Sequence, residues 1–378
     1  MSREAPTSPL PLRVELAERS YDIHLGRGVL EAAGEILAAI LSQPRVVVVT
    51  DERLAATPHP GRLEASLARA GIATRRVVVP AGEATKSMGR LEALLDDLLA
   101  HGAERRLTIV ALGGGVVGDL AGFAAAVLLR GVDYVQVPTT LLAQVDSAVG
   151  GKTGVNSRHG KNLIGSFHQP RAVLIDTDTL ATLPERELKA GYAEVVKYGL
   201  IRDGEFFEWL EANGRAVLGG DPAAQAVAIR RSLAVKAAIV AADERETGTE
   251  RALLNFGHTF AHAYEALAGY GGGLLHGEAV SLGMVKALRL SRLLGHCPGQ
   301  DTERAVRHLV SLGMPTRLGD LPGLPPFPAD DLLAAMGRDK KVENARLRFV
   351  LARRIGDAFV SADVPEAAVR EALAADDG

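Results

Sequence analysis

The chain has 378 residues, a formal net charge of −3 and a single cysteine, Cys297. This length is sufficient for two domains, the well-mixed charges give no basic surface for nucleic acid, and one cysteine excludes an intrachain disulfide or a cysteine-based metal cluster. The sequence contains no run of about 18 apolar residues, so a membrane span is not expected. The N-terminus lacks the apolar segment of a signal peptide, so we expect a cytoplasmic protein.

The first half of the chain alternates short β-branched runs with segments of helical apolar spacing. Strands are expected at residues 46–50, 74–79, 107–112, 134–137 and 173–175. Helices are expected at 62–70 and 91–101, and a hairpin at 13–16 and 21–25 precedes the first of these strands. Strands that alternate with helices predict a parallel sheet with crossover helices.

After Pro184 the composition changes. Helices rich in Ala, Leu and Arg predominate there, as far as a Pro- and Gly-rich region at 315–328. The sequence therefore predicts an α/β, Rossmann-like nucleotide-binding domain at 1–184. A mostly α-helical domain is predicted to follow at 185–378. Its histidines and carboxylates make it the predicted metal- and substrate-binding domain.

A glycine-rich segment at 113–118 fits the pattern G-x-G-x-x-G, directly after a predicted strand and before a helix that starts at Asp119. Such glycines let the backbone approach a pyrophosphate at a helix N-terminus. This context favours a dinucleotide over a tight turn of a parallel sheet. The acidic residue usually found about 20 residues further on is missing. Asp51, at the end of an earlier strand, could replace it in a rearranged domain, or could be an ordinary loop residue.

The segment Gly150-Gly-Lys152-Thr resembles the end of a phosphate-binding P-loop. That motif requires glycine four residues before Gly150, where this chain has Asp146. A carboxylate at this position would repel the phosphates that the loop should hold, so the sequence argues against an ATPase.

Histidines and a carboxylate in the second half could bind a metal ion. His258 and His262 are one helical turn apart, His276 follows a Gly-rich loop, and Glu194 and Lys197 share a face of a separate helix. Two histidines and a carboxylate are typical of catalytic Zn²⁺ sites. The spacing does not decide whether both His258 and His262 bind the ion, and an H-x-x-x-H pattern can simply be a polar helix face.

Two further polar residues precede these histidines at helical spacing. Asn255 precedes His258 by three residues and Arg251 precedes Asn255 by four, so we expect both on the same helix face as His258 and His262. Arg251 could contact an anionic ligand there, or be solvated.

Lysine is rare in this chain: nine of the 43 basic residues are lysines. Most of them lie in compact polar motifs, which suggests a small anionic ligand bound by several segments; a skewed composition is the alternative. Lys189 and Lys286 have no such setting and are expected to be solvated. For Lys236 the sequence gives the weakest support for a role in ligand binding, because this residue lies on an ordinary Ala- and Val-rich helix.

Taken together, these motifs resemble the 3-dehydroquinate synthase family of sugar-phosphate cyclases. The segments that carry the resemblance lie at 113–123, 130–131, 136–142, 144–156, 160–165, 167–170, 191–197, 254–262, 275–279 and 339–342. They occur in the family's order over roughly residues 12–362. The loop at 269–275 is slightly longer than is usual.

The resemblance implies a role for each matching residue. It implies a divalent ion, Zn²⁺ or Co²⁺, bound by Glu194, His258 and His276, with His262 a catalytic residue and not a ligand. It implies NAD⁺ bound by Asp51, Glu83, Lys86, Gly115, Val116, Val117, Gly118, Asp119, Thr139, Thr140, Lys161, Thr179 and Thr182. It implies a substrate phosphate at Lys152, Asn162, Lys340 and Arg130, a substrate carboxylate at Arg251 and Lys236, and a catalytic pocket completed by Asp146, Lys152, Lys197 and Asn255. Arg130 would come from the partner in a homodimer.

The implied reaction, a step of the shikimate pathway, converts 3-deoxy-D-arabino-heptulosonate 7-phosphate to 3-dehydroquinate and phosphate. NAD⁺ would oxidise the substrate transiently, phosphate would leave by β-elimination, and re-reduction, ring opening and an intramolecular aldol step would follow. A related cyclase that makes an inosose, a valiolone or an aminodehydroquinate is the first alternative, although such enzymes tend to change the residues that match Lys197, Lys236, Asn255 or His262. A metal- and NAD-dependent polyol dehydrogenase is the second, and would need no phosphate-binding lysines.

Overall fold

The computed structural model describes residues 11–269, 273–338 and 347–374. It divides into two compact units, Met1–Pro184 with Gln225–Ala241, and Glu185–Ala224 with Ala242–Gly378. The chain thus returns to the first unit through most of helix α8 (Pro222–Ala242), a return that nothing in the sequence indicates. Within the described residues, no helix combines the length and hydropathy needed to cross a membrane.

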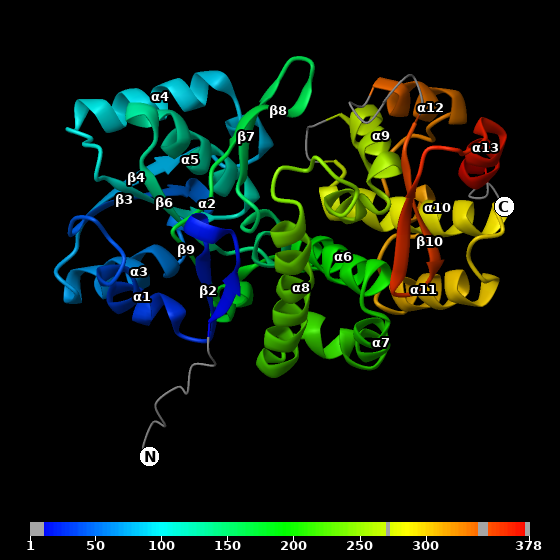
Figure 1. Ribbon diagram of the computed structural model, residues 1–378, viewed down its shortest axis with the longest axis horizontal. Coiled ribbons are helices and arrows are strands. Elements are labelled where there is room, and N and C mark those ends of the chain that lie inside the picture. Colours follow the sequence, from blue (N-terminus) through cyan, green and yellow to red (C-terminus); the bar gives the residue numbers. More distant parts are fainter. Residues whose placement is uncertain (1–10, 270–272, 339–346, 375–378) are drawn as a thin grey trace. The chain divides into compact units, whose positions relative to one another are not determined.

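A seven-stranded sheet forms the centre of the first unit (Figure 1), in the order β1-β2-β9-β6-β5-β3-β4. Its strands are β1 (Leu12–Val14), β2 (Tyr21–Gly26), β3 (Arg45–Asp51), β4 (Ala73–Val79), β5 (Thr108–Gly113), β6 (Asp133–Pro138) and β9 (Ala172–Asp176). Every neighbouring pair is parallel except the hairpin β1–β2. The predicted parallel α/β sheet and its added hairpin are therefore confirmed.

Both faces of this sheet are covered, as is usual for parallel strands. In β3, Val46 and Val48 pack on one side with the apolar side chains of α1 and α3, whereas Val47 and Val49 pack on the other with those of α4 and α5. The helices of this unit are α1 (Val29–Ala38), α2 (Glu52–Ala55), α3 (His59–Arg69), α4 (Met88–Ala100) and α5 (Gly115–Val127). Shorter helical segments are η1 (Ala17–Arg19), η2 (Glu83–Thr85), η3 (Leu128–Arg130), η4 (Ala143–Ser147) and η5 (Thr177–Thr182).

An antiparallel hairpin, β7 (Lys152–Ser157) with β8 (Gly160–Phe167), also belongs to the first unit. The sequence analysis did not predict it, because glycines and polar residues replace the β-branched residues that usually mark strands. Gly165 shows why glycine is needed: a Cβ there would lie 2.1 Å from the backbone oxygen of Thr153 on the paired strand.

The second unit is mostly helical, as predicted. Its helices are α6 (Glu185–Ile201), α7 (Gly204–Leu218), α9 (His258–Ala268), α10 (His276–Leu293), α11 (Gly299–Ser311), α12 (Ala329–Arg338) and α13 (Glu366–Ala374), with η6 (Arg251–Asn255) and η7 (Leu318–Asp320). A two-stranded antiparallel sheet, β10 (Phe349–Arg354) with β11 (Asp357–Ser361), was not predicted. Helix α10 is buried along most of its length.

Helices α6 and α10 approach each other very closely where α10 begins. A Cβ atom at Gly277 would lie 1.8 Å from the backbone oxygen of Ala190, which no side chain can tolerate. Glycine at position 277 therefore sets the distance between the two helices.

Lys286 of α10 was expected to be solvated, and that expectation is wrong. Its side chain is fully buried, and its ammonium group donates a hydrogen bond of 2.9 Å to the backbone oxygen of Leu373 in α13. A positive charge near the last carbonyl groups of a helix is favourable, because those groups carry partial negative charge. The neighbouring residues of α10 contain no signal for this contact.

His308 of α11 lies in the core of the second unit, with its Nε2 atom 3.1 Å from the hydroxyl oxygen of Tyr192. Burial lowers the pKa of His308 from 6.5 to about 4. Between these pH values His308 binds a proton in the unfolded chain but not in the folded chain. Its contribution to the free energy of unfolding is therefore complete above pH 6.5 and is lost as the pH falls toward 4.

We therefore expect the wild-type protein to lose about 2 kcal/mol more unfolding free energy than His308→Gln when the pH falls from 7.5 to 5. Urea unfolding of both proteins at the two pH values measures this difference. Equal losses in the two proteins would contradict the assignment of the buried neutral histidine.

Candidate functional site

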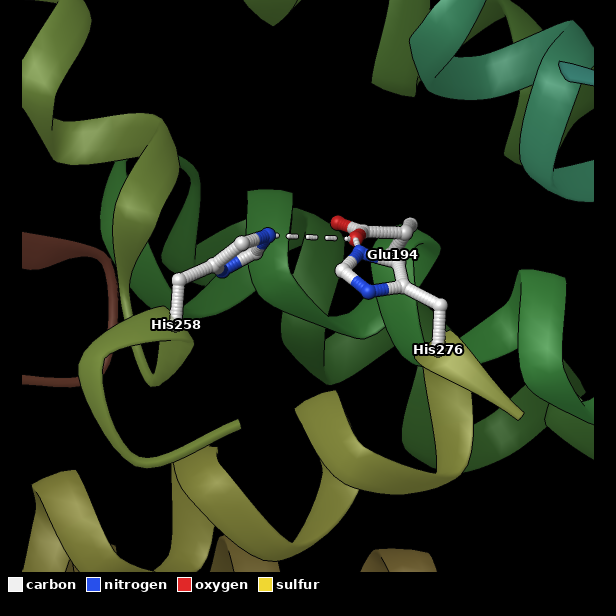
Figure 2. Close-up of side chains that lie close together, drawn as sticks. All are labelled: Glu194, His258 and His276. Atoms are coloured by element: carbon white, nitrogen blue, oxygen red, sulfur yellow. Dashed lines mark ion pairs between the residues drawn. The ribbon is translucent and has the colours of Figure 1, made fainter. Parts of the chain in front are cut away.

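Three side chains of the second unit converge on one point (Figure 2): Glu194 from the middle of α6, His258 at the start of α9 and His276 at the start of α10. The Nε2 atoms of His258 and His276 lie 3.6 and 3.5 Å from Oε1 of Glu194, and the ligand atoms all lie within 4.8 Å of one another. Ligands of a tetrahedral Zn²⁺ at about 2.1 Å from the ion are about 3.4 Å apart. The spacing and the donor atoms therefore fit a zinc ion.

A backbone reversal places His258 in this group. The segment η6 ends at Asn255, and Gly257 has a left-handed conformation with φ of 79° before α9 begins. A Cβ at Gly257 would also lie 2.6 Å from the backbone nitrogen of Met284 in α10. The expectation that Arg251 and Asn255 share a helix face with His258 and His262 is therefore wrong, because a turn separates the two segments.

Glu194 is completely buried, and its Oε2 atom lies 2.5 Å from the ammonium nitrogen of Lys197. Burial of the His276 imidazole lowers its pKa, but the carboxylates of Glu265 and Glu194 outweigh this effect and raise the pKa to about 10. A carboxylate and two imidazole groups are donors that suit a divalent cation such as Zn²⁺.

Three other predicted residues of this unit are described, namely His262, Arg251 and Asn255. The ring of His262 lies 5.5 Å from that of His258 and 6.3 Å from that of His276, measured between centroids, so His262 adjoins the two histidines of the candidate metal site. Arg251 is buried, not solvated, and its guanidinium donates to the backbone oxygen of Glu244. Asn255 donates to the carboxylate of Glu246 at 3.2 Å. Lys340 and loop residues 270–272 lie outside the described residues.

In the first unit, β5 ends at Gly113 and α5 begins at Gly115, as the glycine pattern predicts. A Cβ atom at Gly118 would lie 2.8 Å from Oε1 of Gln136 on β6, so glycine allows the helix to pack closely on the sheet. The backbone nitrogen of Gly118 already donates to the oxygen of Gly114 at 3.0 Å, so the amide groups left for a ligand at this helix end are those of Gly115, Val116 and Val117. Phosphate groups bind favourably at such a position.

Lys86 connects this helix to the β7–β8 hairpin. Its buried ammonium group lies 2.6 Å from Oδ2 of Asp119 and 2.5 Å from Oδ1 of Asn162. The side chain of Asn156 donates to Glu83 at 2.8 Å and accepts from the backbone nitrogen of Asn162 at 2.9 Å. Residues predicted for NAD⁺ and for the substrate phosphate are thus in direct contact, and Asn156 is a member of the cluster that the sequence analysis missed.

A second buried lysine, Lys236 of α8, pairs with Asp146 of η4, with 2.7 Å between Nζ and Oδ1. Lys152 is exposed at the start of β7, Lys161 is half-buried on β8, and Arg130 is exposed. Arg130 follows Leu129 in an unusual turn, in which both residues have positive φ values of 71° and 50°.

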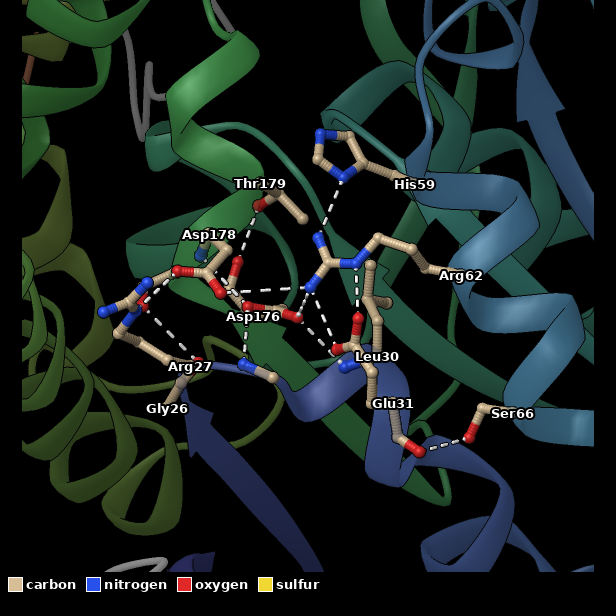
Figure 3. A network of polar contacts seen from close by, with 12 residues as sticks. Gly26, Arg27, Leu30, Glu31, His59, Arg62, Ser66, Asp176, Asp178 and Thr179 are labelled. Carbon is tan, nitrogen blue, oxygen red and sulfur yellow. Dashed lines mark hydrogen bonds and ion pairs between the residues drawn. The ribbon is translucent and has the colours of Figure 1, made fainter. Parts of the chain in front are cut away.

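The carboxyl end of β9 holds a polar network that the sequence analysis also missed (Figure 3). Buried Asp176 accepts hydrogen bonds from the backbone nitrogens of Gly28 and Leu30, at the start of α1, and pairs with Arg62 at 3.1 Å. The hydroxyl of Thr179 donates to the Asp176 backbone oxygen and accepts from the amide of Gln144. Thr179 is therefore almost wholly buried and engaged within the protein, so its predicted contact with NAD⁺ stays a prediction.

The remaining residues predicted for NAD⁺ lie at or near strand ends of the same sheet. Asp51 is the last residue of β3, and its side chain accepts hydrogen bonds from the backbone nitrogens of Arg53 and Leu54 at the start of α2. Thr139 and Thr140 follow β6, the first buried and the second half-buried. Thr182 is exposed, and its hydroxyl lies 2.9 Å from Nε2 of His59.

Comparison with known proteins agrees with this arrangement. Models of the N-terminal and C-terminal regions of 3-dehydroquinate synthase match residues 76–190 and 191–342. The 3-dehydroquinate synthase of Rhodospirillum rubrum is 58% identical over 364 residues, which cover 96% of this chain and 94% of that protein.

Two solved structures are similar along nearly the whole chain. A 2-epi-5-epi-valiolone synthase from Streptomyces hygroscopicus with bound NAD⁺ and Zn²⁺ has a TM-score of 0.85 and 32% identity, and the match covers 95% of this chain and 97% of that one. A 2-deoxy-scyllo-inosose synthase complexed with carbaglucose-6-phosphate, NAD⁺ and Co²⁺ has a TM-score of 0.83 and 26% identity, covering 96% and 99%. With its carboxylate and two histidines, its glycine turn and these matches along its length, the chain belongs to the 3-dehydroquinate synthase family.

Proposed function

We propose that this protein is a 3-dehydroquinate synthase, which converts 3-deoxy-D-arabino-heptulosonate 7-phosphate to 3-dehydroquinate and phosphate. The observation that carries the proposal is the arrangement of Glu194, His258 and His276 in a chain that is 58% identical to a named 3-dehydroquinate synthase. The residues Lys197, Lys236, Asn255 and His262, which related cyclases tend to change, are all present here.

The proposal includes both cofactors. Glu194, His258 and His276 would hold Zn²⁺ or Co²⁺ in the helical unit, and NAD⁺ would lie at the glycine turn and the neighbouring strand ends of the sheet. When bound, the ion would polarise substrate hydroxyl groups and NAD⁺ would accept and return one hydride. Their presence in the solved structures of two related cyclases supports this assignment.

The polar residues of the chain would bind and orient the substrate. Lys152 and Asn162 on the β7–β8 hairpin would hold the phosphate, with Arg130 and Lys340 as further contacts. Lys236 and Arg251 would hold the carboxylate, because their fixed positive charges suit an anion. Lys197, His262 and Asn255 would move or hold protons beside the metal ligands, and Asp146 keeps Lys236 in position.

We further propose that the enzyme acts as a homodimer in the cytoplasm, with Arg130 supplied by the partner subunit. The consecutive positive φ values at Leu129 and Arg130 support a functional role for this exposed turn, because such backbone strain is retained mainly at functional positions.

One assay tests the reaction and separates it from that of a polyol dehydrogenase. Protein, a catalytic amount of NAD⁺, Zn²⁺ and the heptulosonate phosphate are mixed, and phosphate release and absorbance at the NADH wavelength are followed together. We expect phosphate in an amount equal to the substrate without accumulation of NADH. NADH formed in proportion to substrate consumption would indicate a dehydrogenase instead.

The phosphate role of Lys152 gives a specific expectation. Lys152→Ala should raise the KM for the sugar phosphate about 10- to 100-fold, since a hydrogen bond to a charged group is lost, and should leave the Kd for NAD⁺ nearly unchanged. Steady-state kinetics and NAD⁺ titration measure the two effects. Lys189→Ala, which removes a lysine paired with Glu185 on α6, is the matched control. Equal losses of substrate and NAD⁺ binding would argue against the phosphate role.

A further inference from the structure

The two histidines of the candidate metal site are held differently on the side that faces away from Glu194. The Nδ1 atom of His258 lies 3.2 Å from the backbone oxygen of Phe256. The Nδ1 atom of His276 lies 3.2 Å from Oε2 of Glu265, a carboxylate whose side chain is only 5% exposed. Both partners can accept a hydrogen bond from Nδ1, so each ring can keep its hydrogen on Nδ1 and offer the Nε2 lone pair to a bound ion.

Glu265 reaches His276 from the helix that also carries His258. Positions 258 and 265 of α9 are seven residues apart and lie on the same helix face, two turns from each other. His276 begins the following helix, α10. Helix α9 therefore supplies one ligand directly and holds a second through a carboxylate, which fixes two ligands relative to each other.

We propose that Glu265 is a positioning residue for the metal ion: it orients the His276 imidazole with Nε2 toward the ion and strengthens its electron donation. Metal-bound histidines commonly donate their other ring N–H to a carboxylate or a carbonyl group, and loss of that partner weakens metal binding about 10- to 100-fold. The inference rests on the proposed metal site.

Charge distinguishes Glu265 from a residue that merely fills space. An ionised carboxylate at Nδ1 makes His276 a stronger donor than the neutral carbonyl at His258 does for its own ring. Glu265 also adds a negative charge to that of Glu194 near the ion. The isosteric change Glu265→Gln keeps the size and an acceptor oxygen but removes this charge, so it tests the electrostatic contribution separately from packing.

The test uses the full-length protein freed of metal with a chelator. Zinc affinity is measured by competition with a chromophoric chelator, and the visible absorption of bound Co²⁺ reports the geometry of the ligands. We expect Glu265→Gln to bind zinc about 10- to 100-fold more weakly than wild type and to shift the Co²⁺ bands. Glu265→Asp, which keeps the charge on a shorter side chain, should recover part of the affinity and keeps the test valid if the glutamine variant does not fold.

Tyr192→Phe is the matched control, since it removes the polar partner of another buried histidine, His308, from the helix that carries Glu194. We expect wild-type zinc affinity and Co²⁺ bands for this variant, and unchanged NAD⁺ binding for all of them. Wild-type affinity and bands in both Glu265 variants would overturn the positioning role alone. Failure of the wild-type protein itself to bind zinc would overturn the proposed metal site as well.

Discussion

Replacing His258 by alanine is expected to remove the bound metal ion and to lower turnover of the heptulosonate phosphate on the order of 1000-fold. Only Glu194 and His276 would then remain of the three ligand atoms that lie within 4.8 Å of one another. Two ligands are too few for a zinc site, which normally has three protein ligands when it is catalytic. Metal content after dialysis and the rate of phosphate release measure the two losses.

His262→Ala is the informative comparison, because the sequence spacing leaves open which of the two histidines binds the ion. His262 adjoins the three ligands but is not among them. We expect this variant to keep its zinc and to lose activity. Zinc loss in His262→Ala together with zinc retention in His258→Ala would reverse the assignment.

Gly277→Ala is expected to destabilise the protein by about 3 kcal/mol, at the upper end of the usual effect of overpacking, and to weaken zinc binding. The added methyl group would lie 1.8 Å from the backbone oxygen of Ala190, so α6 and α10 must move apart. Because α6 carries Glu194 and α10 carries His276, this movement would separate two of the proposed metal ligands. Urea unfolding of the metal-free protein and zinc titration measure the two effects.

Gly89→Ala in α4 is a suitable control. Among the residues that the structure describes, no atom lies within 4 Å of its Cβ position apart from its chain neighbours and the backbone of its own helix. It should be neutral, or stabilising by up to about 1 kcal/mol, because alanine favours helix formation. Similar destabilisation by both substitutions would show that the contact between Gly277 and Ala190 is not the cause.

Much of the α/β unit could be predicted because its signals are local. The valines of β3 form a continuous apolar run since both faces of the sheet are covered, and the glycines at 113–118 mark the turn into α5. The hairpin at β7 and β8 could not be predicted in this way. There, glycine is needed for close contact between backbones, and the usual strand-forming residues are missing.

The ligand set illustrates what motif spacing can and cannot determine. Spacing places His258 and His262 close together, but the choice between them depends on Gly257, whose left-handed conformation starts a new helix at His258. Glu265 and Lys286 appear in the sequence as ordinary charged residues of helices. Their burial depends on which helices pack against α9 and α10, and that is determined by contacts between distant parts of the chain.

The path of the chain through α8 has a consequence for attempts to divide the protein. Residues Gln225–Ala241 belong to the same unit as the sheet, although they follow forty residues of the helical unit, Glu185–Ala224. A fragment that stops at Pro184 would lack Lys236, and Asp146 would lose the ammonium group with which it pairs. Neither half can be produced intact by a single cut, so truncation experiments would have to splice the returning helix onto the sheet with a linker.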